Sequence, residues 1–283
     1  GRNTADAEML VHLFIELTDD LSYARTFYPG TETTRYLHGL ASRVHQQIYQ
    51  SKKEESGRII RFWKYELPEI FYRSRRELLY SFLIFAFSVF IGWLSSANDN
   101  TFVRLIMGDR YVNMTIYNIT HDDPMAVYKE MHQVDMFLGI TVNNVFVSFY
   151  AFLMGVVLSF GTAFILLQNG IMLGAFHYLL YEYDLLGEAM LTIWIHGTIE
   201  ISAIILAGGA GLVMGNSILF PGTYTRMQSF RQGVLRGMKL AVGLVPMFII
   251  AGFLEGFVTR YTGMPLWLSL IIILGSLAFM IWY

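Results

Sequence analysis

Residues 78–97 have the sequence LLYSFLIFAFSVFIGWLSSA, an uncharged run of 20 residues. As an α-helix, this run would be about 30 Å long, which matches the hydrocarbon core of a bilayer. The whole chain has the same character, because 54% of its 283 residues are hydrophobic and only 15% are charged. An average soluble domain has about 25% charged residues. The chain is therefore predicted to be an integral membrane protein.

A longer uncharged run lies between Asp135 and Glu182, where 46 residues include no Asp, Glu, Lys or Arg. This run is too long for one membrane span and fits two. We expect the turn between the two spans at residues 168–170, Gln-Asn-Gly. The residues assigned to this turn are Asn169, Gly170 and Gly174. The second helix of the pair, at about 171–183, is then short, and is tilted or crosses only half of the membrane.

Three further apolar stretches, residues 189–219, Leu240–Thr259 and Met264–Tyr283, bring the total to about six spans. Glu255 lies near one end of the fifth span and is expected to reach the membrane surface. The predicted fold class is all-α, a polytopic transmembrane helical bundle preceded by amphipathic cytoplasmic helices.

The residues before the first span are amphipathic. Residues 1–56 carry apolar side chains at steps of three and four, which predicts a cytoplasmic helical hairpin. Residues 57–77 mix aromatic with basic side chains, as is typical of a helix in the headgroup layer. The transmembrane domain is expected over residues 78–283, with an external insertion at 98–135 that contains short helices.

The basic residues predict the orientation in the membrane. Of the 20 Lys and Arg residues, 12 precede the first span. Loop 182–188 carries only acidic charges, whereas loop 220–239 carries four basic residues and no acid. Basic loops stay in the cytoplasm. We therefore expect both termini to be cytoplasmic and the insertion 98–135 to be external.

The motif His-Gly-Thr-Ile-Glu, from His196 through Gly197 to Glu200, lies inside the fourth span. His196 and Glu200 are four residues apart, so they share one face of a helix. A charged group within a membrane is costly and normally has a partner, for which Asn143 and Asn144 are the candidates. The motif either ties helices together, or relays protons or ions, or forms a ligand or catalytic site.

Small residues form two seams that favour close helix packing in lipid. The seam that continues the face of the motif consists of Ala203, Ala207, Gly211 and Gly215. The second span is expected to carry a matching seam, which consists of Ser148, Ala151, Gly155, Ser159 and Thr162.

The sequence offers little support for catalysis. It contains no cysteine, no nucleotide-binding Gly-x-x-x-x-Gly-Lys-[Ser/Thr] motif and neither Gly-x-Ser-x-Gly nor His-Glu-x-x-His. His196 and Glu200 supply two metal ligands, but a catalytic zinc needs three, so we expect no metal and no other cofactor. An intramembrane protease of the CAAX type would need a Glu-Glu-x-x-x-Arg helix, and Glu54-Glu55 precede Arg58 at the wrong spacing. The net charge of −2 gives no indication of a nucleic-acid partner.

Over residues 75–283, the chain resembles the stage II sporulation protein M family. The resemblance rests on Asn143-Asn144, on Asn169-Gly170 with Gly174, on His196-Gly197-x-x-Glu200 and on the small residues 207–211. It implies a bacterial membrane protein without known catalytic activity. In spore-forming bacteria, founding members of the family act with cell-wall-degrading partners, and many relatives occur in bacteria that do not form spores.

The expected function is that of a non-enzymatic scaffold in an envelope complex of the bacterial cytoplasmic (inner) membrane, with a link to cell-wall remodelling as one option. Its expected partners are membrane lipid and other envelope or membrane proteins, and the small-residue seams also allow a homo-oligomer. The alternative is a channel or transporter with a polar path at His196 and Glu200. A third class, an intramembrane hydrolase, would require a bound metal.

Overall fold

The computed structural model describes residues 2–49, 57–121, 132–259 and 264–283. Nearly all of these residues are helical, and none of them forms a β-strand. The predicted all-α class is therefore confirmed. The chain divides into two compact units, Gly1–Ile59 and Ile60–Tyr283.

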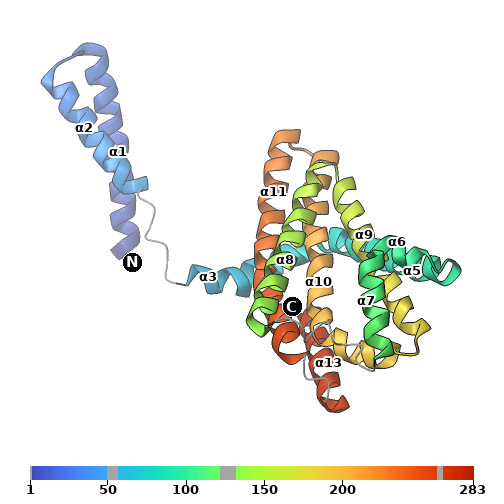
Figure 1. Ribbon diagram of the computed structural model, residues 1–283. Coiled ribbons are helices and arrows are strands. Elements are labelled where there is room, and N and C mark those ends of the chain that lie inside the picture. The colour runs from blue at the N-terminus through green and yellow to red at the C-terminus, as the bar shows by residue number, and fades with distance from the viewer. Residues whose placement is uncertain (1, 50–56, 122–131, 260–263) are drawn as a thin grey trace. The chain divides into compact units, whose positions relative to one another are not determined.

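The first unit is a helical hairpin of α1 (Arg2–Phe27) and α2 (Glu32–Tyr49), which lie side by side in Figure 1. Its interface is small and buries Leu21, Ala24 and Ala41. The last residues of the predicted hairpin, 50–56, lie outside the described residues.

The segment predicted to lie in the headgroup layer is helical but divided into α3 (Arg58–Arg61), η1 (Phe62–Glu66) and α4 (Leu67–Arg73). One of its faces packs against the rest of the second unit. Leu67 is fully buried against the backbone of Gly243, and Trp63 Nε1 donates a hydrogen bond of 3.2 Å to the Gly243 carbonyl. Some side chains of this segment therefore contact the rest of the protein, and others are exposed.

Five helical segments of the second unit are long and apolar enough to cross a membrane. They are α5 (Arg75–Asn98), α8 (Gln133–Leu153), α9 (Phe160–Glu182), α10 (Leu186–Leu219) and the continuous series α11 (Arg226–Gly243), α12 (Val245–Phe253) and η4 (Leu254–Val258). The last apolar helix, α13 (Leu266–Trp282), has 17 residues and would be about 25 Å long. A polytopic helical membrane protein is thus confirmed, with five long spans and a shorter sixth helix.

Helix α10 lies at the centre of the second unit (Figure 1). Of the 18-residue apolar stretch in this helix, 72% is buried, whereas the corresponding stretches of the other four spans are 22–44% buried. It contacts α5, α8, α9, α11, α12 and α13. Glycines on several sides of α10 permit this, because Gly208 touches Leu166 of α9 and Gly209 touches Leu78 of α5. The small residues of α10 therefore serve more than one neighbour.

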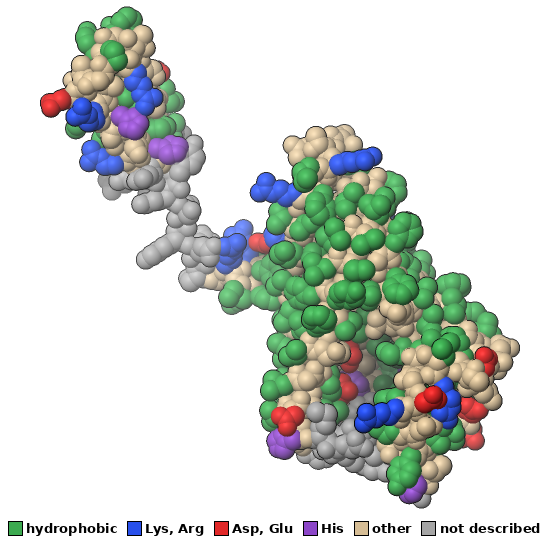
Figure 2. Space-filling model, turned by 45° about the horizontal axis from the view of Figure 1, so that its top comes forward, with side chains coloured by type: hydrophobic (Ala, Val, Ile, Leu, Met, Phe, Trp, Pro, Cys, Tyr) green, Lys and Arg blue, Asp and Glu red, His purple; other side chains and the backbone are tan. Residues whose placement is uncertain are grey.

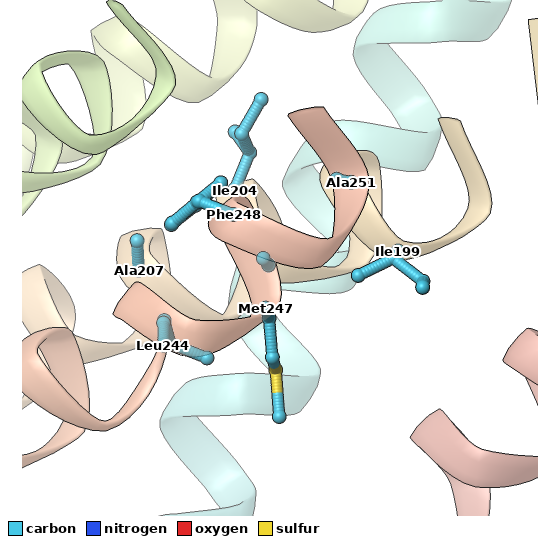
Figure 3. Close-up of a cluster of buried hydrophobic side chains, with 8 residues drawn as sticks. Ile199, Ile204, Ala207, Leu244, Met247, Phe248 and Ala251 are labelled. Carbon is cyan, nitrogen blue, oxygen red and sulfur yellow. The ribbon is translucent and has the colours of Figure 1, made fainter. Parts of the chain in front are cut away.

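The largest hydrophobic cluster joins α10 to α12 (Figure 3). Phe248, Leu244 and Ala251 are fully buried against Ala203 and Ala207 of α10. This cluster holds the end of α12, and with it η4, beside the first half of α10.

The predicted turn at residues 168–170 is wrong, because α9 runs unbroken from Phe160 to Glu182. The predicted short helix at 171–183 is wrong for the same reason. Asn169 remains in the helix because its side chain donates a hydrogen bond of 2.8 Å to the carbonyl of Ile165. Gly170 and Gly174 lie against the backbone of α5 and allow the two helices to approach closely.

The chain reverses between α8 and α9 instead, in a 3-10 turn at Met154–Val156 and the residues that follow it. Leu158 and Ser159 adopt left-handed backbone angles, with φ of 49° and 68°. Such angles are unfavourable for residues with a side chain. The packing around this reversal therefore has to stabilise it.

Residues 98–135 contain two short helices, α6 (Phe102–Met107) and α7 (Asp109–Thr120). Val103 of α6 and Val112 of α7 are buried together with Leu179 of α9. Residues 122–131 of the predicted insertion lie outside the described residues.

Candidate functional site

His196 lies in the first half of α10 with only 5% of its surface exposed. Its Nδ1 is 3.0 Å from Thr259 Oγ1, at the end of η4. The Thr259 hydroxyl in turn donates a hydrogen bond of 3.1 Å to the carbonyl of Leu254. The motif on α10 is thereby attached to the last turn of the fifth span.

Glu200 lies one turn further along α10, and Glu255 of η4 faces the same point. His196 Nε2 is 3.8 Å from Glu255 Oε2, and one ligand atom from each of the three residues lies within 4.8 Å of the other two. The Glu255 side chain is only 14% exposed. The expectation that Glu255 reaches the membrane surface is therefore wrong, and the third ionisable group that seemed absent is present.

Glu255 was missed because it lies 55 residues from Glu200 in the chain. A signal was available, since it is the one acid in the stretch Leu240–Thr259 and has Gly252 and Gly256 on either side. Gly252 packs against Thr141 of α8, and Gly256 packs against Phe137. This close approach holds Glu255 within the bundle. The π-helical turn at η4 is also of a kind that often occurs at functional sites.

The two asparagines differ in their positions. Asn144 is buried on α8 close to the Glu200 carboxyl group, whereas Asn143 is exposed and does not join the cluster. The Nδ2 atom of Asn144 makes no hydrogen bond within the described residues. Thr141 Oγ1 on the same helix is also buried and also lacks a hydrogen-bond partner within the described residues.

Gly197 is buried, yet a Cβ atom at this position would meet only Ile193 and Ile201 at ordinary contact distances of 3.7–3.8 Å. Helix packing in this structure therefore does not require glycine at residue 197.

The predicted seams meet each other, but the second is not carried by one helix. Ser148 and Ala151 are on α8, Gly155 and Ser159 are in the reversal, and Thr162 is on α9. Gly155 contacts the backbone of Gly211, and Ser159 contacts Gly215. The α10 seam is divided as well, because Ala203 and Ala207 face α12.

Tyr111 of α7 lies close enough to the cluster for the charge of Glu255 to act on it. Burial first, and the negative charge of Glu255 second, raise the pKa of the Tyr111 phenol above its ordinary value. His177, the other membrane histidine, is not part of the cluster. Its Nδ1 is 2.8 Å from the carbonyl of Leu173, and its Nε2 accepts a hydrogen bond from Trp194 Nε1.

The site therefore consists of one imidazole and two carboxyl groups in the membrane domain, with a buried amide beside them. Such a group can share protons, bind a cation or tie helices together.

Comparisons with known proteins assign the family. Residues 2–50 match a family model described as a domain of unknown function (DUF8413). No curated protein and no solved structure matches the chain. The model of stage II sporulation protein M matches residues 81–260, which are 180 of the 283 residues and contain every member of the polar cluster. The resemblance drawn from the motifs is thus confirmed, and the chain belongs to the stage II sporulation protein M family.

Proposed function

We propose that this membrane protein is a non-enzymatic scaffold that binds other proteins of the bacterial envelope at the inner membrane. The main support comes from the first unit, which exposes many large apolar side chains. They are Met9, Val11, Leu13, Ile15, Tyr23, Phe27, Tyr28 and Tyr36. Exposed apolar surface of this kind marks interaction sites.

The second unit suits a scaffold because its helices are in backbone contact. Gly92 lies on Ile171, Gly174 on Val89 and Gly155 on Gly211. Contacts of this kind leave little room for the helices to slide past each other. They also stabilise the bundle, because van der Waals packing is a main force that holds helices together in lipid. A closely packed membrane domain joined to a helical hairpin with exposed apolar side chains is well suited to binding partner proteins.

The test is affinity purification of the full chain from its own membrane in mild detergent. The wild-type protein is expected to retain envelope proteins, whereas the double variant Val11→Gln/Ile15→Gln is expected to lose them. The matched control is His12→Gln/Glu16→Gln, which changes an exposed polar pair on the same helix. Recovery of the free protein alone, or equal recovery of partners with both double variants, would contradict the proposal.

A second candidate function is transport, which is favoured by the three ionisable groups at His196, Glu200 and Glu255. Intramembrane groups of this kind often mark ion or proton pathways. The Glu200→Gln substitution separates the two functions. It should abolish uptake into proteoliposomes if the protein is a transporter, whereas partner retention by a scaffold should not change.

A further inference from the structure

We propose that His196, Glu200 and Glu255 bind one divalent transition-metal ion, with Zn²⁺ as the first candidate. The three residues come from α10 and η4, and their nearest ligand atoms all lie within 4.8 Å of one another. The proposal does not depend on whether the protein is a scaffold or a transporter.

The charges of the cluster favour a cation. Two carboxylates so close together in a partly buried site repel each other, and the low dielectric of the surroundings strengthens that repulsion. A divalent ion between them would convert the repulsion into attraction. Within the described residues, the basic side chain paired with Glu255 is that of His196, whose Nε2 is 3.8 Å from Glu255 Oε2.

Thr259 orients the imidazole of His196 for metal binding. A hydroxyl group has one proton. When Thr259 Oγ1 donates it to the Leu254 carbonyl, it accepts a hydrogen bond from His196 Nδ1–H. The Nε2 atom of the neutral ring then presents its lone pair on the side of Glu255. Metal-binding histidines in proteins almost always have such a second-shell partner on the other nitrogen.

The distances are close to those of a metal site. Ligand atoms around a tetrahedral zinc ion with bonds of about 2.0–2.1 Å are roughly 3.4 Å apart. The His196–Glu255 pair, at 3.8 Å, is already near this value. The other pairs of ligand atoms lie within 4.8 Å, so the carboxyl groups would have to turn toward the ion to reach bonding distance. One imidazole and two carboxylates suit zinc, manganese or iron better than a soft ion such as Cu(I), and leave a fourth position for water.

Asn144 provides a second, independent observation. Its side chain is buried to more than nine tenths and lies close to the Glu200 carboxyl group, but Nδ2 makes no hydrogen bond within the described residues. A buried amide without a hydrogen bond is costly. If Glu200 turned to bind a metal, its second oxygen could accept the Asn144 N–H, as second-shell groups do.

The Glu255 side chain is 14% exposed, so the cluster is not fully sealed from its surroundings. The face shown in Figure 2 is hollowed in one place, and acidic and histidine side chains are visible inside this hollow.

The test measures bound metal directly. The full chain is purified in detergent with a tag that does not bind metal, stripped with a chelator and titrated with ZnCl₂ alone, and then separately with MnCl₂ and FeCl₂. Wild-type protein is expected to bind one equivalent of one of these ions. His196→Ala and Glu255→Gln are expected to lose at least tenfold in affinity, because the removal of a ligand should cost no less than the loss of a second-shell partner, which is about 10- to 100-fold. The matched control His177→Gln changes a buried histidine outside the cluster and should bind normally.

Thr259 variants distinguish a positioned site from adventitious binding. Thr259→Val is expected to weaken metal binding about 10- to 100-fold, whereas Thr259→Ser should restore it. The bound ion should also raise the unfolding temperature of the wild-type protein but not that of Glu255→Gln, which keeps the shape of the side chain. The proposal is overturned if the wild-type protein binds none of the three ions stoichiometrically, or if Glu255→Gln binds as tightly as the wild type.

Discussion

Gly155 and Gly211 are in backbone contact, so that a Cβ atom on Gly155 would overlap the carbonyl group of Gly211. Gly155 lies in the reversal between α8 and α9, and Gly211 lies on the central helix α10. Neither backbone can move away easily, because Thr162 and Ser159 fill the adjacent space. This contact therefore positions the reversal against the centre of the bundle.

Gly211→Ala is expected to destabilise the protein by about 1–3 kcal/mol, because an added methyl group in a packed contact forces the backbones apart. Gly197→Ala is the matched control on the same helix. Its added methyl group meets side chains at 3.7–3.8 Å, so it should be neutral, or stabilise the helix by about 0.5–1 kcal/mol. Unfolding in SDS, followed by circular dichroism, measures both variants. Equal stability of the two would show that the contact is looser than described.

The hydroxyl group of Thr162 donates a hydrogen bond of 2.7 Å to the carbonyl of Ala151, across the same reversal. This carbonyl belongs to the last turn of α8, where carbonyl groups lack helical partners. Thr162→Val keeps the shape of the side chain and is expected to cost about 0.5–1.5 kcal/mol. Thr162→Ser should recover most of this loss. An unchanged midpoint of unfolding for Thr162→Val would mean that another group satisfies the carbonyl.

The number and nature of the spans could be predicted because length and charge suffice for them. The position of the reversal could not be found from turn residues, since Leu158 and Ser159 are not typical at positive φ and Asn169 is accommodated within a helix. Length was the better signal. Half of the uncharged run 136–181 ends at residue 158, within the observed reversal.

The polar cluster could be predicted only where its members are close in the chain. His196 and Glu200 share a face by helical spacing alone. Glu255 joins them through the packing of α12 on α10 and through the π-helical turn at η4, and neither can be derived from spacing. The distinction between Asn143 and Asn144 likewise depends on the rotation of α8, which tertiary contacts determine.

Leu67 and Glu66 are neighbours that should contribute very differently to stability. Leu67 is fully buried, so Leu67→Ala is expected to cost about 2–5 kcal/mol. Glu66 forms an ion pair of 3.0 Å with Lys239, but these side chains are 42% and 50% exposed. Lys239→Gln should therefore cost less than about 1 kcal/mol. Thermal unfolding in detergent compares the two variants, and a larger effect of Lys239→Gln would contradict this view of the α4–α11 contact.

The predicted orientation can be tested with single cysteines, because the natural sequence contains none. Thr120 ends α7 and Thr223 lies in the loop before α11, and both are exposed. The basic residues at 226–239 should hold Thr223 in the cytoplasm, whereas Thr120 should lie outside. In intact cells, a membrane-impermeant maleimide is expected to label Thr120→Cys but not Thr223→Cys. Thr223→Cys should react only after the cells are permeabilised. The opposite pattern would reverse the topology, and would place the His196 end of α10 on the cytoplasmic side of the membrane.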